Sequence, residues 1–95
     1  MISEDGRKRA DYLCSVMKGI SGLDPKVKSR CSDVVSVRCM VACQLMKEGM
    51  TSLDVAELFG KTHPTILYYK WRFLSFFSPG WEQEHELWEK FKKAI

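Results

Sequence analysis

A run of polar residues that can bind nucleic acid lies in the second half of the chain. Lys61, Thr62, His63, Pro64 and Thr65 follow a glycine and stand at the start of a predicted helix. A lysine can neutralise a phosphate, and threonine and histidine can hydrogen-bond to base edges. In a helix-turn-helix motif, the second helix enters the major groove of DNA with its N-terminal end leading. These residues therefore indicate contact with double-stranded DNA.

The positive charge of the chain is concentrated in its middle. The whole chain has a net charge of +3, whereas residues 26–72 contain eight basic and four acidic side chains. The basic ones are Lys26, Lys28, Arg30, Arg38, Lys47, Lys61, Lys70 and Arg72. A central basic surface suits a polyanion such as DNA. An excess of this size also occurs in domains that bind no nucleic acid, so the charge supports the motif but does not replace it.

Other reactive side chains form no recognisable catalytic or metal site. Cys39 and Cys43 are one helical turn apart, but no second pair of cysteine or histidine ligands lies nearby. Burial as small apolar residues explains them better than a zinc site does. His85 lies in an acidic segment, where a structural role is favoured. Since no serine, histidine and acid arrangement indicates a nucleophile, we expect no enzyme activity, no metal, no cofactor and no small-molecule substrate.

The spacing of apolar residues predicts five helices and no strand. These helices are expected at residues 4–20, 33–48, 53–59, 64–77 and 81–94. Breaks between them are expected at Gly22 with Asp24 and Pro25, at Gly49, at Gly60 and at residues 78–80. Ser32 is the predicted N-cap of the second helix, and Thr51 or Ser52 that of the third. Pro64 is predicted to occupy the first position of the fourth.

The two helices on either side of Gly60 meet the physical demands of a helix-turn-helix. Ala56 is small enough for close helix contact, and Gly60 tolerates the positive φ of the turn. Apolar contacts would come from Val55, Phe59 and Ile66. The expected inward residues further along are Ile66, Tyr69, Phe73 and Phe77, followed by Trp81, Trp88, Phe91 and Ile95. The chain is thus predicted to be one all-α domain, residues 1–95, a compact bundle of about five helices with a helix-turn-helix at about 52–77.

Residues 34–74 resemble the C-terminal DNA-binding domain of the bacterial replication initiator DnaA. The resemblance rests on the stretch VAELFGKTHPTI, residues 55–66. There an apolar-small pair and an aromatic residue precede a glycine, a basic residue, a histidine and a hydroxyl residue. Arg38 near the start of a long helix and the basic segment 26–30 also fit the family pattern. The resemblance implies a Trp-repressor-like or DnaA-like helical fold and sequence-specific binding of double-stranded DNA.

The resemblance implies roles for single residues. His63 and Thr65 match family residues that read base edges, although His63 can instead serve as a helix N-cap with its ring on the surface. All candidate base-reading residues are Thr62, His63, Pro64, Thr65 and Tyr68. The candidate contacts to the DNA backbone are Lys26, Lys28, Arg30, Arg38, Lys61 and Arg72.

Some positions depart from the family pattern. Thr62 replaces an acidic residue, Pro64 replaces a serine or threonine, and Tyr69 replaces a small residue on the recognition helix. The loop is also one residue shorter than in many members. We therefore expect the chain to read a sequence other than the origin box. Without the initiator's ATPase domain, it would act as a bacterial or phage regulator or replication accessory factor rather than as an ATP-dependent initiator.

Alternatives for the aromatic C-terminal part remain open. The segment 68–73 interleaves aromatic and basic residues, which can stack single-stranded bases, but Tyr69 and Phe73 are expected to face the core. The outward residues Tyr68, Trp71 and Arg72 can touch DNA or form a protein interface. The second functional hypothesis is a helical protein-interaction module that keeps the fold and has lost specific DNA binding. A homodimer through residues 81–95 is compatible with the first hypothesis. The chain has no apolar run of about 18 residues and no signal peptide pattern, so we expect a cytoplasmic protein without a membrane partner.

Overall fold

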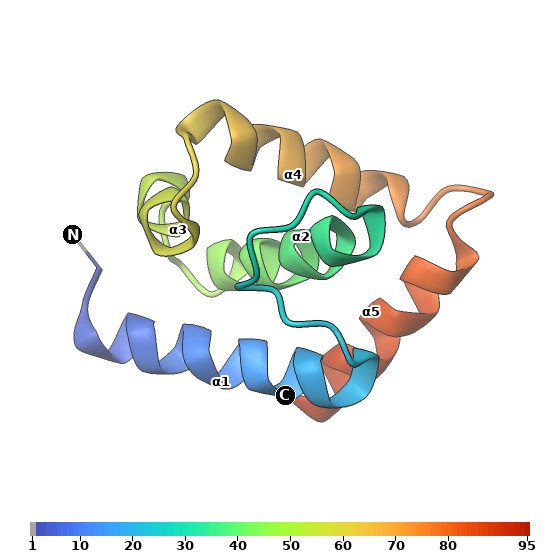
Figure 1. Cartoon of the computed structure of the whole chain (residues 1–95), viewed down its shortest axis with the longest axis horizontal. Coiled ribbons are helices and arrows are strands. Elements are labelled where there is room, and N and C mark those ends of the chain that lie inside the picture. The colour runs from blue at the N-terminus through green and yellow to red at the C-terminus, as the bar shows by residue number, and fades with distance from the viewer. Residues whose placement is uncertain (1) are drawn as a thin grey trace.

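The computed structural model describes residues 2–95, which form five α-helices and no strand (Figure 1). The helices are α1 (Glu4–Ser21), α2 (Ser32–Lys47), α3 (Ser52–Phe59), α4 (His63–Ser75) and α5 (Glu82–Ala94). The predicted all-α bundle is therefore confirmed. None of the helices in this part of the chain is long and apolar enough to cross a membrane.

Helix α2 forms the centre of the core. It is buried on all sides over Cys39, Met40, Val41 and Ala42, which are consecutive and therefore point in all directions around the helix. In Figure 1, α2 lies between α4 and α1, and it contacts α1, α3 and α4. Helix α5 packs against α1. Its predicted stripe is confirmed, since Trp88 and Phe91 belong to the core.

The glycine stops are at their predicted places. Gly22 and Gly60 adopt the left-handed conformation at the ends of α1 and α3. Gly49, with φ of 109°, follows α2, where the amide of Met50 donates to the carbonyl oxygen of Leu45 at 3.0 Å. This pair of features ends a helix with its last carbonyl groups satisfied. The local sequence therefore determines where the first three helices end.

The N-terminal caps agree with the prediction in one helix and differ in another. The hydroxyl of Thr51 accepts a hydrogen bond from the amide of Asp54 at 3.2 Å, as predicted for α3. In α2 the predicted cap is wrong, because Cys31 occupies the N-cap position and Ser32 is the first helical residue. Ser32 lies one position too late to cap the helix, and its hydroxyl instead accepts a hydrogen bond from Arg72 of α4 at 2.8 Å.

The end of α4 also differs from the prediction. The helix ends at Ser75 rather than Phe77, and Phe76 is buried while Phe77 is 48% exposed. After the last helical turn the backbone directs Phe76 toward Trp81, with ring centroids 5.5 Å apart. Helical spacing alone selects Phe77, but the helix does not extend that far. The buried aromatic residue is therefore Phe76.

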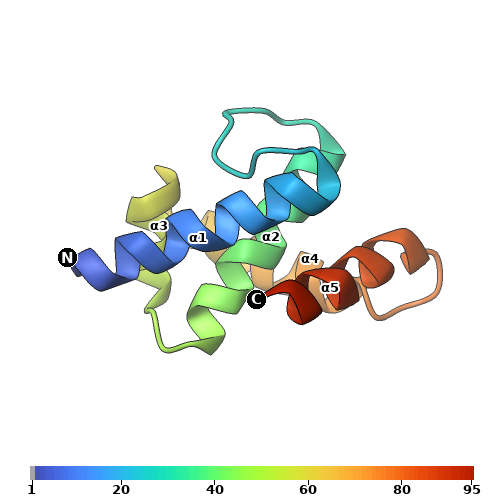
Figure 2. The same ribbon diagram turned by 90° about the horizontal axis from the view of Figure 1, so that it is seen from below.

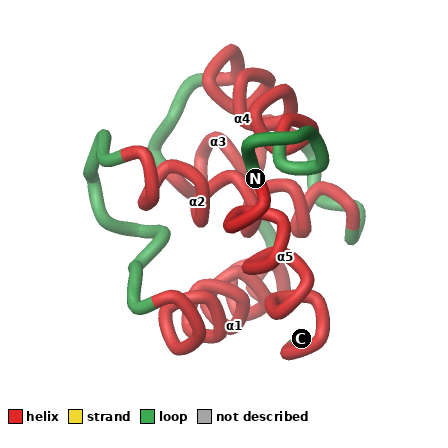
Figure 3. Tube along the Cα trace, turned by 90° about the vertical axis from the view of Figure 1, so that its right-hand side faces the viewer, coloured by secondary structure: helices red, strands yellow, loops and turns green. Residues whose placement is uncertain are grey.

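Two connections important for the site lie on the same side of the molecule. Residues 60–62 join α3 to α4, and residues 22–31 join α1 to α2. Both connections run on the side nearest the viewer in Figure 1, and Figure 3 shows both along its left-hand edge. The view from below in Figure 2 agrees, with the long connection and the end of α3 at the top. The fold thus places the basic segment and the start of α4 on one face.

Candidate nucleic-acid interface

A tight turn joins α3 to α4. Gly60, with φ of 65°, lets the amide of Lys61 donate to the carbonyl oxygen of Ala56 at 2.8 Å. Val55 and Ile66 are buried to either side, and Ala56 is almost completely buried. Phe59 is half-buried against the core. The predicted helix–turn contacts are therefore present, and they fix the direction in which α4 leaves the turn.

The start of α4 presents polar side chains to solvent. Thr62 occupies the N-cap position, and its hydroxyl bonds to that of Thr65 at 3.0 Å instead of capping the helix. His63 is the first helical residue rather than the cap, so Pro64 occupies the second helical position and not the predicted first one. Thr62, His63 and Pro64 are exposed, and Thr65 is half-buried. This surface carries no acidic side chain in the first turn of α4.

The ring of His63 is held by the start of α3. A hydrogen bond of 2.9 Å joins its Nε2 to the hydroxyl of Ser52. This contact orients the imidazole, and Nδ1 has no hydrogen-bond partner within residues 2–95. From the sequence, Ser52 is predicted only as an alternative cap for α3. Because Thr51 supplies that cap, the hydroxyl of Ser52 is left for another contact, which is the one with His63.

Arg38 is buried rather than on the surface, so the predicted contact with a DNA backbone is corrected. Arg38 as a whole residue is 3% exposed. Its guanidinium donates to the carbonyl oxygens of Pro25 at 3.0 Å and Ser29 at 3.3 Å, and also to that of Val27. A further bond of 3.2 Å reaches the phenol oxygen of Tyr69 on α4. Arg38 thus fixes the connection between α1 and α2 against α4.

The sequence predicts only an apolar, inward-facing role for Tyr69. It is buried as predicted, but its phenol oxygen is also one of the acceptors for Arg38. A buried tyrosine needs a partner for its hydroxyl, so the residue type itself was a signal for a polar contact.

Arg72 also makes its main contacts within the protein. It donates to the carbonyl and hydroxyl oxygens of Ser32 at 3.1 and 2.8 Å, and to the hydroxyl of Ser36 at 3.2 Å. Another bond of 3.2 Å reaches the phenol oxygen of Tyr68, which is 52% exposed. Arg72 therefore joins α4 to the start of α2 and orients Tyr68.

The basic loop, residues 26–30, contributes cations of two kinds. Lys26 pairs with Asp11 of α1, and this hydrogen bond raises the pKa of the Lys26 ammonium group. Lys28 and Arg30 are exposed and make no ion pair or side-chain hydrogen bond within residues 2–95. Lys61, half-buried at the turn, is equally unpaired in this part of the chain. The cations free to meet an anion on this face are therefore Lys28, Arg30 and Lys61.

The remaining reactive groups show no ligand arrangement. Burial raises the pKa of the Cys14 thiol to about 11 and those of Cys39 and Cys43 to about 12, so these thiols stay protonated at neutral pH. Within residues 2–95, no group of three or more histidine, cysteine, aspartate or glutamate side chains is placed to hold a metal. The Nε2 atom of His85 lies 3.5 Å from Oε1 of Glu89 on the same helix.

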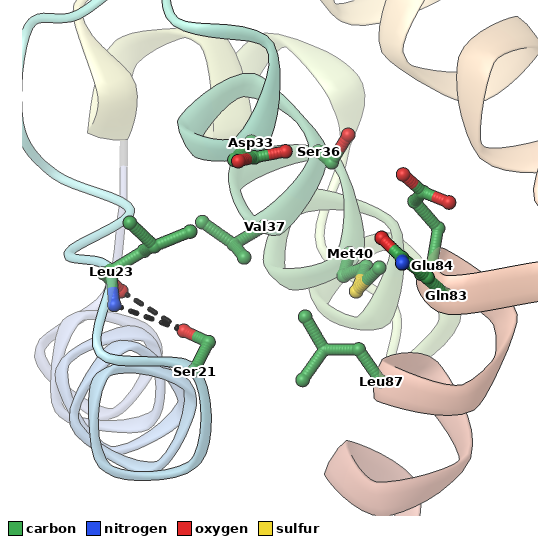
Figure 4. Close-up of a pocket in the computed structure, with 9 residues that line it drawn as sticks. All are labelled: Ser21, Leu23, Asp33, Ser36, Val37, Met40, Gln83, Glu84 and Leu87. Atoms are coloured by element: carbon green, nitrogen blue, oxygen red, sulfur yellow. Dashed lines mark hydrogen bonds between the residues drawn. The ribbon is translucent and has the colours of Figure 1, made fainter. Parts of the chain in front are cut away.

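A cavity of about 210 Å³ lies between the end of α1, α2 and α5 (Figure 4). Its polar edge includes Asp33 and Glu84, while Leu23, Val37 and Leu87 lie below them. Two carboxylates do not favour an anionic ligand. The volume is also below the roughly 300 Å³ at which ligand pockets usually begin. This cavity is therefore a weaker candidate than the face formed by α4 and the basic loop.

Comparisons of the chain with models of protein families, with curated proteins and with solved structures found no match. The resemblance to the DnaA C-terminal domain thus rests on the residues quoted above.

Proposed function

We propose that this chain binds double-stranded DNA sequence-specifically, with α3 and α4 acting as a DnaA-like helix-turn-helix and without ATPase activity of its own. One observation carries the proposal. The exposed polar start of α4 and the cations Lys28, Arg30 and Lys61, which are unpaired within residues 2–95, lie on one side of the molecule. A reader of DNA needs this combination, because base contacts give sequence preference and phosphate contacts give affinity and register.

In this proposal, α4 enters the major groove with its first turn. His63 meets a base edge through Nδ1, since Nε2 is bonded to Ser52. The hydroxyls of Thr62 and Thr65 bond to each other, and each retains capacity for another hydrogen bond. Pro64 and Tyr68 would add apolar contacts beside them. Such contacts suit the thymine methyl group in the major groove.

The backbone contacts divide into direct and indirect ones. Lys28, Arg30 and Lys61 would bind phosphates directly. Arg38, Arg72 and Lys26 act through their protein partners. Arg38 holds the carbonyl groups of the basic loop, and Arg72 holds α4 against α2. A small reader of this kind fits a regulatory or replication-accessory role.

The experiment is a selection from random double-stranded DNA at physiological ionic strength, followed by binding measurements on the enriched sequence. We expect His63→Ala to reduce the preference for that sequence by about 5- to 100-fold, the range for loss of one good base contact. The matched control is His85→Ala, because His85 lies on α5 and pairs with Glu89. It should bind like the wild type. Failure to enrich any sequence, or equal preference in both variants, would contradict the proposal.

A further inference from the structure

A groove lies between the second half of α2 and one flank of α4. Its lining is Cys43, Met46, Lys47, Lys70, Phe73 and Leu74, and its volume is about 380 Å³. We call this feature the α2–α4 groove. Lys70 and Arg72 are two positions apart on α4, so they project to nearly opposite sides of that helix. Because Arg72 binds the start of α2, the groove lies on the flank of α4 away from that contact.

The groove continues into an exposed apolar stripe on α4. Leu67, Trp71 and Leu74 are spaced by four and three residues and therefore lie on one helical face. Trp71 is 72% exposed and Leu74 is 60% exposed. Single exposed apolar residues are ordinary, but a contiguous set beside an apolar groove indicates an interaction surface.

The charge of the groove is entirely positive. Lys47 and Lys70 make no ion pair within residues 2–95, whereas Lys8, Lys26, Lys90 and Lys92 all pair with carboxylates. Helix α4 itself contains no acidic residue. A complementary ligand would thus present apolar side chains flanked by carboxylates.

We propose that the α2–α4 groove docks an acidic amphipathic helix of a partner protein. Large apolar side chains spaced at i and i+4 would fill the space over Met46, Phe73 and Leu74. Glutamate or aspartate beside them would pair with Lys47 and Lys70. This is the helix-in-groove mode of recognition, in which a few anchors supply most of the binding energy.

Two other occupants fit the groove less well. A DNA backbone would satisfy the two lysines but would leave the apolar lining uncovered. In a second copy of the chain, α4 is equally basic, and packing α4 on α4 would oppose like charges. Helix α5 is acidic in its first turn, but Trp88 and Phe91 on its apolar side are already buried in its own core. The charge and the apolar lining together favour an acidic partner helix.

The test uses the full chain and displayed random peptides of about four helical turns. We expect the enriched peptides to combine large apolar residues at helical spacing with several acidic residues. Binding of one synthesised peptide is then measured by fluorescence anisotropy. Leu74→Glu should weaken it by about tenfold or more, as expected for loss of an interface anchor. The matched control is Leu53→Glu, because Leu53 on α3 is 65% exposed and lies outside the groove lining.

Charge reversal gives a second readout. Lys70→Glu should weaken binding of the acidic peptide. It should strengthen binding of a version of that peptide in which lysine replaces glutamate. His63→Ala should leave peptide binding unchanged, so that the failure of this proposal and the failure of DNA binding are distinguishable.

Several results would overturn the proposal. One is that the enriched peptides are not acidic and apolar. Another is that Leu74→Glu and Leu53→Glu bind the synthesised peptide equally well. A dimer of the wild-type chain that Leu74→Glu dissociates in sedimentation equilibrium would assign the groove to a second copy instead. If Lys70→Glu lost as much DNA binding as His63→Ala does, Lys70 would be a DNA contact instead.

Discussion

The guanidinium of Arg38 is buried, and three of its acceptors are backbone carbonyl groups of residues 25–29. In the proposed complex, a basic residue would thus support the DNA interface without touching the DNA. The bonds hold the basic loop in one conformation, and Tyr69 adds a contact to α4. Lys28 and Arg30 therefore project from a loop whose position is coupled to the helix carrying His63.

Removing the phenol oxygen of Tyr69 should loosen this coupling. In Tyr69→Phe, a buried N–H of Arg38 loses its acceptor, which costs about 1–3 kcal/mol of unfolding free energy. We also expect faster hydrogen exchange at the backbone amides of residues 26–30 in the free protein. Tyr68→Phe is the matched control, since the hydroxyl of Tyr68 also accepts a hydrogen bond from an arginine, Arg72, but that bond is exposed rather than buried. Unchanged stability and loop exchange in Tyr69→Phe would show that the contact does not hold the loop.

At the scale of elements, glycine positions determine how the helices end. Gly60 has a left-handed conformation, and apart from the residue itself and its two chain neighbours no heavy atom lies within 4 Å of where its Cβ would be. A substitution there would therefore meet backbone strain and no steric clash. Gly19 is equally open, but it lies inside α1 without a positive φ. The two glycines form a matched pair.

The two alanine substitutions should have opposite signs. Gly60→Ala is expected to lower the unfolding free energy by about 1–2 kcal/mol, the cost of a left-handed conformation for an L-residue. Gly19→Ala should raise it by about 0.5–1 kcal/mol because alanine favours a helix over the unfolded chain. Urea denaturation of the two variants measures both effects. A neutral Gly60→Ala would mean that the turn before α4 adapts to another conformation.

The elements were largely predictable from the sequence because their boundaries are local. Gly22, Gly49 and Gly60 end their helices regardless of how the helices pack against one another. The choice between Phe76 and Phe77 was not predictable in this way, since it depends on where α5 places Trp81. The site shows the same division. The polar residues that begin α4 follow from local sequence, whereas the burial of Arg38 requires carbonyl groups that only the folded loop brings together.

At the scale of the whole molecule, an ion pair joins the two long helices α1 and α2 near the end of α2. Arg9 donates to both carboxylate oxygens of Glu48 at 2.8 and 2.9 Å. These hydrogen bonds lower the pKa of the Glu48 carboxyl below its ordinary value of 4.5. Since the folded pKa is lower than the unfolded one, the stabilisation is complete above the unfolded pKa. It is lost as pH falls through the folded value.

Replacement of Arg9 should consequently have a pH-dependent effect. Arg9→Gln is expected to lower the unfolding free energy by about 0.5–1 kcal/mol at pH 7, the upper part of the range for exposed pairs. Below the folded pKa of Glu48, the variant and the wild type should converge. Urea denaturation across this pH range gives the comparison. Arg7→Gln serves as the control because Arg7 is exposed on the same helix and makes no ion pair within residues 2–95. A difference independent of pH would rule out the ion pair as its cause.

The central claim is that the start of α4 and the basic loop form a single DNA interface. Mapping amide chemical shifts by NMR during titration with the selected double-stranded DNA tests it most directly. We expect the largest changes at residues 61–63, 65 and 28–30, with little change along α5 or in the α2–α4 groove. Changes confined to α5 or to the groove, or no changes at all, would contradict the account.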